Sequence, residues 1–292
     1  MNQSTRTVQI SPVKADAAPR GGRVKAEVAS PTASETTQKD RNVVTALVRG
    51  LRVLEVFTAP DVWLGNGEIA ARTGLPKPTV SRLTDTLTSL GYLRHSARAR
   101  QYRLGTSVLT LGYAVFGNLD VRQIARPRMQ KFADQYNGFV ALGGRDRFDI
   151  VHLDAYHSKT TMLTLRDSAG SRARLVNTAF GRALISAMLP NERDALLEQL
   201  AMQRPEKWAP IERELKKAFS QIKEHGFCVV KGLWSPDINA VGVPLRRPGA
   251  EPLAIGCAGD SRRLTIERMN DQVGPALVLL ARQIELELQK RG

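Results

Sequence analysis

The pattern of apolar and polar positions divides the chain near residue 41. Residues 1–40 are rich in Ser, Thr, Ala, Pro and Gly and show no hydrophobic period. We therefore predict a disordered, solvated tail there. From residue 43 onward, apolar residues return at intervals of three and four, which predicts an amphipathic helix that ends near Pro60. Its apolar positions are Val44, Leu47, Val48, Leu51 and Leu54.

Two further helices are predicted close behind the first. The pattern over 67–73 predicts a short helix that stops at Gly74, a residue that tolerates the left-handed conformation after a helix end. Pro78 suits the first turn of the next helix, which should run to Leu90. Its predicted inward residues are Val80, Leu83, Leu87 and Leu90. Its outward face, typical of a helix that lies in a major groove, carries Thr79, Ser81, Arg82, Asp85, Thr86 and Ser89.

A basic hairpin is predicted after the third helix. Residues 92–94 and 101–104 have the character of two strands, and the turn between them contains Arg98 and Arg100. A helix, a short helix, a glycine turn, a helix and a hairpin together form a winged helix-turn-helix. The chain has a net charge of +15, and residues 41–105 hold ten Lys or Arg against four Asp or Glu. This concentration of positive charge favours binding to nucleic-acid phosphates.

The remaining pattern predicts an α+β domain. A helix over 107–119 could link two domains or pair with a partner chain, although ordinary core packing explains it equally well. A helix over 121–136 follows. Short strands are then predicted at 138–144, 150–153, 160–166, 227–233, 238–244 and 253–257, and helices at 181–189, 193–200, 212–225 and 265–290. We thus divide the chain into a tail (1–40), a DNA-binding domain (41–105), a linker helix (106–120) and an effector-binding and oligomerisation domain (121–292).

The sequence predicts a cytoplasmic protein. The longest apolar run near the C-terminus, residues 276–281, is far shorter than the roughly 18 apolar residues that a membrane span requires. Residues 1–10 contain no apolar core of a signal peptide. Two cysteines, Cys228 and Cys257, form no CxxC pair, which fits a reducing compartment.

An enzyme is the first alternative, because the second domain contains two cysteines, several carboxylates and His152, His157 and His225. The sequence has no HExxH, GxSxG, P-loop or CxxC motif. The one spacing of interest, His152-x-Asp154-x-x-His157, is a weak metal-binding pattern. We predict that the protein is not an enzyme and has no catalytic residues, metal ion or cofactor.

Several segments resemble one known family. In the first domain these are residues 46–54 (ALVRGLRVL), 68–83 (EIAARTGLPKPTVSRL), 90–93 (LGYL) and 102–105 (YRLG). In the second domain they are residues 177–184 (NTAFGRAL) and 238–245 (INAVGVPL). Their order and spacing are similar to those of the isocitrate lyase regulator (IclR) family of bacterial transcription factors, over about residues 41–290.

The resemblance implies a winged-helix domain, a linker helix and a GAF-like effector domain. It implies a repressor or activator, in dimers or tetramers, whose binding to double-stranded operator DNA is altered by a small metabolite, with catabolic genes as targets. By position, the DNA contacts would be Lys77, Thr79, Ser81 and Arg82 on the helix and Arg98, Arg100 and Arg103 in or near the wing. Pro78 departs from the family, where Ser or Thr is common.

Residues 177–184 are similar to the family's small-residue loop before a helix, and the resemblance implies an effector pocket between this loop and the later strands. It maps to Ala179, Phe180, Gly181, Asp237, Asn239, Gly256, Cys257 and Ala258. Relatives that bind small keto acids have hydroxyl residues where this chain has Gly256 and Ala258. We therefore expect a bulkier or more apolar effector, an organic acid or an aromatic metabolite, although Gly256 and Ala258 could simply allow close packing.

Two non-enzymatic alternatives stay open. The second domain could serve oligomerisation alone and bind no ligand. The winged helix could bind only proteins, in which case its basic residues would be ordinary surface charges.

Overall fold

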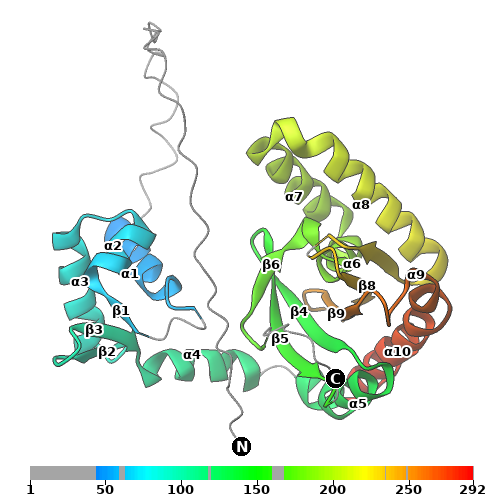
Figure 1. Ribbon diagram of the computed structural model, residues 1–292, viewed down its shortest axis with the longest axis horizontal. Helices are drawn as coiled ribbons and strands as arrows, with labels where there is room; N and C mark the ends of the chain where they lie inside the picture. Colours follow the sequence, from blue (N-terminus) through cyan, green and yellow to red (C-terminus); the bar gives the residue numbers. More distant parts are fainter. Residues whose placement is uncertain are drawn as a thin grey trace, which may run out of the picture. The chain divides into compact units, whose positions relative to one another are not determined.

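The computed structural model describes residues 44–58, 63–117, 120–159, 168–233, 235–247 and 249–291. The predicted tail over 1–40 and the predicted strand over 160–166 lie outside the described residues. The chain forms two compact units, residues 1–104 and 105–292. Figure 1 labels the helices and strands of both units.

The N-terminal unit is a winged helix-turn-helix. Its helices are α1 (Thr45–Glu55), α2 (Asn66–Thr73) and α3 (Lys77–Ser89). Its strands are β1 (Leu64–Gly65), β2 (Leu93–Ser96) and β3 (Gln101–Leu104), which pair antiparallel in the order β1-β3-β2. The pattern predicted the three helices and the hairpin. It did not predict β1, which is too short to show a period.

Local signals explain the boundaries of this unit. Gly74 ends α2 in the left-handed conformation, with φ +71°, and its N–H donates to the carbonyl of Ala70. Pro78 lies in the first turn of α3, where a missing N–H costs nothing. The core of the unit contains Val53, Leu64, Ile69, Val80, Leu93 and Tyr102. The prediction that Leu90 points inward is wrong, because α3 ends at Ser89 and Leu90 is 60% exposed.

The C-terminal unit is built around a six-stranded antiparallel sheet with the order β6-β5-β4-β9-β8-β7. The strands are β4 (Phe139–Asp146), β5 (Asp149–His157), β6 (Arg172–Arg174), β7 (Cys228–Lys231), β8 (Ile238–Leu245) and β9 (Leu253–Asp260). The helices are α4 (Thr106–Gly117), α5 (Asp120–Tyr136), α6 (Ala179–Ala187), α7 (Pro190–Gln203), α8 (Pro205–His225), α9 (Ile266–Arg268) and α10 (Gly274–Arg291). The closing helix predicted over 265–290 is interrupted by a π-helical turn at Met269–Val273.

Helices cover both faces of this sheet (Figure 1). On one face, α5 and α10 pack against Val140, Leu142 and Val241. On the other face, α6 and α8 pack against Phe139 and Ala141. Because side chains alternate between the faces of a strand, each central strand contributes to two separate cores. The fold class is α+β, as the sequence predicted, and no helix of the described residues is long and apolar enough to cross a membrane.

Candidate functional site

The start of α3 presents cations to solvent. Lys77 and Arg82 are exposed, whereas Thr79 is half-buried. Within the part of the chain that the structure describes, no carboxylate forms an ion pair with Lys77, Arg82, Arg98 or Arg100. Unpaired, exposed cations on a helix start are available to phosphates and base edges.

Ser81 lies on a different side of α3 from Arg82. Its Oγ accepts a hydrogen bond of 3.1 Å from Nδ2 of Asn66, at the start of α2. Asn66 Oδ1 in turn accepts one of 3.3 Å from the hydroxyl of the buried Thr84. Asn66 therefore fixes the angle between α2 and α3. No local sequence pattern predicts this role of Asn66, because it depends on how two helices pack.

The wing carries the remaining predicted DNA contacts. Arg98 and Arg100 are exposed in the turn between β2 and β3, and Arg100 has a φ of +51°, a conformation that glycine adopts without strain. Arg103 on β3 is half-buried, and its guanidinium lies 4.9 Å from the centre of the Trp63 ring. This cation–π contact restricts the Arg103 side chain.

A small cavity lies in the C-terminal unit between the start of α6 and the sheet. Its volume is about 50 Å³. The apolar wall consists of Phe139, Ala173, Ala179, Phe180, Val230, Leu233, Ile238, Ala240 and Ala258, and the polar lining residues are His152, Asn177 and Thr178. An aromatic ring needs a cavity on the order of 150 Å³. A ligand of that size therefore enters only if lining side chains move, and Leu233 is the most exposed of the large apolar ones at 44%.

Glycines bring α6 very close to the sheet. A Cβ on Gly242 of β8 would lie 2.2 Å from the carbonyl oxygen of Ala179, and one on Gly181 would lie 2.1 Å from that of Leu175. Thr178 caps α6, since its Oγ1 accepts a 2.9 Å hydrogen bond from the Gly181 N–H. The positive end of the α6 dipole consequently borders the cavity.

Aromatic rings pack along one side of the cavity. The ring of Phe180 covers Gly256, where a Cβ would lie 1.7 Å from two ring carbons. The imidazole of His152 is only 3% exposed and lies 5.5 Å from the Phe139 ring and 5.7 Å from the Phe180 ring, measured between centroids. His152 is thus a buried polar group within an aromatic wall.

The structure brings some of the predicted effector residues to this cavity and not others. Ala179, Phe180 and Ala258 line it, Gly256 supports Phe180, and Gly181 lies in the first turn of α6. Asn239 and Cys257 project from the opposite face of the sheet. There Asn239 donates to the carbonyl of Leu264 at 2.9 Å, and Cys257 joins the core under α5 and α10. Asp237 precedes β8 and is not among the lining residues; its carbonyl accepts from Ser261 at 2.8 Å.

The alternation of strands explains these differences. Residues adjacent along a strand face opposite sides, so Ala240 and Ala258 face the cavity while Asn239 and Cys257 face away from it. Ile238 and Ala240, which alternate with Asn239 along β8, line the cavity instead. His152 and Phe139 come from strands that the resemblance did not associate with the pocket.

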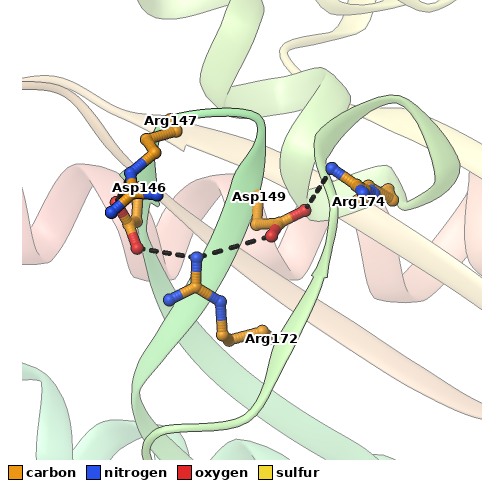
Figure 2. A network of polar contacts seen from close by, with 5 residues as sticks. All are labelled: Asp146, Arg147, Asp149, Arg172 and Arg174. Carbon is orange, nitrogen blue, oxygen red and sulfur yellow. Dashed lines mark hydrogen bonds and ion pairs between the residues drawn. The ribbon is translucent and has the colours of Figure 1, made fainter. Parts of the chain in front are cut away.

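Ion pairs hold the edge strand that borders the cavity (Figure 2). Nη2 of Arg172 on β6 lies 2.7 Å from Oδ2 of Asp146 and 3.4 Å from Oδ2 of Asp149, at the turn between β4 and β5. Arg174 contacts the other oxygen of Asp149 at 3.3 Å. Ala173, between the two arginines, lines the cavity. The network therefore anchors one cavity wall.

Comparison with known proteins identifies the family. The model of the IclR helix-turn-helix domain matches residues 46–97, and that of the bacterial transcriptional regulator IclR C-terminal matches residues 113–286. The HTH-type transcriptional regulator TsaQ1/TsaQ2 of Comamonas testosteroni is 30% identical over 260 residues, covering 88% of this chain and 93% of the relative. The chain belongs to the IclR family of bacterial transcriptional regulators.

Solved structures of IclR proteins have the same fold. An IclR family regulator from Brucella abortus is 41% identical, with a TM-score of 0.72, and the match covers 87% of this chain and 96% of that one. A transcriptional regulator from Rhodococcus sp. RHA1 is 26% identical, with a TM-score of 0.66, over 86% of this chain and all of that one. The relatives named here are transcriptional regulators, not enzymes.

The thiols of this IclR protein are poorly suited to nucleophilic chemistry. Burial raises the pKa of Cys228 to about 12 and that of Cys257 to about 12 as well. The reactive thiolate is therefore scarce near neutral pH. Among the described residues, no group of three or more His, Cys, Asp or Glu side chains is placed to hold a metal ion, so the spacing from His152 to His157 forms no such site.

Replacing Gly256→Ala should destabilise the C-terminal unit by about 1–3 kcal/mol, because the new Cβ displaces the Phe180 ring. In a Phe180→Ala background the same change should cost much less, since the ring is gone. Chemical unfolding of the four proteins measures this coupling. The matched control is Gly67→Ala, a helical position with open space around it. Equal costs of the Gly256 change in both backgrounds would show that the ring does not impose this glycine.

Proposed function

We propose that this IclR protein binds operator DNA through its N-terminal unit and that a small molecule in the cavity of its C-terminal unit changes this binding. Control of catabolic genes is the expected role. The observation that carries the proposal is the set of exposed cations on α3 and the wing of an IclR helix-turn-helix domain. The cavity between α6 and the sheet supplies the second part.

The cations have different roles on DNA. Arg82 is exposed in the first half of α3, where a guanidinium reaches guanine with two hydrogen bonds. Lys77 and Thr79 contact phosphates, and Ser81, engaged with Asn66, sets the angle of α3. Arg98, Arg100 and Arg103 bind phosphates from the wing, and the cation–π contact with Trp63 restricts the Arg103 side chain.

The cavity favours an aromatic organic acid. Rings of Phe139 and Phe180 provide flat apolar walls, while His152 and the start of α6 favour a carboxylate. The lack of hydroxyl side chains at Gly256 and Ala258 disfavours small keto acids. An IclR homologue from Microbacterium hydrocarbonoxydans, 21% identical to this chain, has been crystallised with 4-hydroxybenzoate. That compound is therefore a reasonable first probe.

Apolar faces of α1 and α4 support a homodimer. On α1 and at its N-cap, the apolar residues at helical spacing are exposed in the single chain: Val44 by 65%, Leu47 by 60%, Val48 by 37% and Leu51 by 51%. On α4, Leu109 and Tyr113 lie four residues apart on one side of the helix, and each is more than half exposed. We assign these faces to a second copy of the chain, because two winged helices are needed to read two half-sites.

Replacing Arg82→Ala should weaken operator binding by about 1–3 kcal/mol and relax sequence preference, because one base contact is lost. Mobility shifts on DNA upstream of its own gene, compared with shuffled DNA at several salt concentrations, measure both effects. Arg213→Ala on α8 removes the same charge from an exposed position elsewhere and serves as the control. If Arg82→Ala and Arg213→Ala bind both DNAs like the wild type, Arg82 does not read the operator.

The cavity should bind aromatic carboxylates in preference to small keto acids. Thermal shift with 4-hydroxybenzoate, benzoate, pyruvate and glyoxylate tests this order, and Ala258→Leu should abolish binding by filling the cavity. Ala71→Leu on the exposed surface of α2 controls for added bulk. Binding of keto acids alone would overturn the ligand class. Binding of none of these compounds would favour a C-terminal unit that serves oligomerisation only.

Replacing Leu47→Glu should convert a dimer into monomers, since a charge is placed in the apolar face of α1. Light scattering coupled to size exclusion measures the mass, and Thr45→Glu on the same helix is the control. A variant that keeps the wild-type dimer mass would exclude α1 from the interface.

A further inference from the structure

Strand β5 contains an irregularity beside the cavity. Gly143 of β4 pairs with His152, and the preceding Leu142 pairs with Asp154, so Leu153 has no residue opposite it. This is a β-bulge. In a regular strand, residues two apart point to the same face. Here the bulge makes the side chains of His152 and Asp154 point to opposite faces of the sheet.

The His152 side of the bulge belongs to the cavity. His152 lines it together with Phe139 and Phe180, and its ring packs against both of theirs. A ligand that is larger than the present volume of about 50 Å³ must displace lining side chains. The His152 imidazole is one of these lining side chains.

The Asp154 side of the bulge belongs to α5. Asp154 is only 6% exposed, and its Oδ2 accepts from Nε of Arg122 at 2.8 Å and from the hydroxyl of Tyr156 at 2.9 Å. Burial and this hydrogen bond raise the pKa of Tyr156 to about 12, so the phenol stays a donor. Arg122 lies in the first turn of α5, the helix that follows α4 along the chain. One carboxylate therefore ties the beginning of α5 to β5.

We propose that the bulge at residues 152–154 transmits occupancy of the cavity to the beginning of α5, and that the Asp154–Arg122 pair is the positioning contact. Because Leu153 has no residue opposite it on β4, the segment can shift there without breaking a pair between β4 and β5. A buried carboxylate that loses its cation is strongly disfavoured, so Arg122 follows when Asp154 moves. The displaced start of α5 then acts on α4, which precedes it in the sequence.

This inference concerns regulation of the cavity assigned under the proposed function, and it rests on that assignment. Its geometry can nevertheless be tested without DNA or ligand. Ala258→Leu and Ala240→Leu both fill the cavity from the sheet and imitate occupancy. Hydrogen exchange followed by mass spectrometry on the full chain reports on residues 120–128, the first half of α5.

Each filling variant should change exchange in residues 120–128 by about fivefold or more, a typical size of coupling between sites. Arg122→Gln should remove this response, and Arg122→Lys, which keeps the charge, should restore at least part of it. The matched control is Arg128→Gln, because Arg128 on the same helix forms a 2.7 Å ion pair with Glu287 of α10 and does not touch the bulge. The response to cavity filling should survive in that variant.

Any of three results would overturn the proposal. The first is unchanged exchange at 120–128 in both filling variants. The second is a response to cavity filling that persists in Arg122→Gln, and the third is a response that is lost equally in Arg128→Gln. Operator binding and ligand binding do not enter the measurement. Failure of the proposed transmission through the bulge is therefore distinguishable from failure of the proposed function.

Discussion

The close approach of α6 to the sheet is the constraint on which the C-terminal unit depends. Gly242 of β8 has room only for a hydrogen atom beside the carbonyl of Ala179, the first residue of α6, and Gly181 of α6 has room only for one beside the carbonyl of Leu175, which precedes the helix. At Gly256 the Phe180 ring occupies the place of a side chain. These contacts bring the first turn of α6, its Thr178 cap and its aromatic residue to one point of the sheet. The cavity exists because α6 begins there and the small side chains of Ala240 and Ala258 leave room beneath it.

The two faces of the sheet consequently have different functions. One face holds the cavity under α6 and α8, and the other holds the core under α5 and α10. Strand β5 contributes to both faces by alternation, and its bulge is the reason why a buried histidine and a buried carboxylate two residues apart reach different surroundings. In the N-terminal unit, Asn66 orients α3 and Trp63 restricts the half-buried Arg103, while Lys77, Arg82, Arg98 and Arg100 are exposed.

Much of the fold could be predicted from the sequence because its signals are local. Gly74 and Pro78 mark helix boundaries through backbone chemistry alone, and helical spacing predicts α1 to α3. The site was predicted less completely. Asn239 and Cys257 were chosen as neighbours of true cavity positions, although strand alternation turns them away. The bulge in β5 has no signature in its own residues, because it depends on the register with β4. Leu90, read as inward, lies beyond the end of α3.

A switch requires a coupling free energy between operator binding by the N-terminal unit and ligand binding in the cavity. Thermodynamic linkage makes this reciprocal: a ligand that changes operator affinity by some factor has its own affinity changed by the same factor. The direct measurement is calorimetric titration of an aromatic carboxylate that binds the cavity into the full chain, with and without saturating operator DNA. The account predicts that the ligand Kd differs by about fivefold or more between the two titrations. Identical ligand Kd values would show that the two units bind independently and would contradict the account.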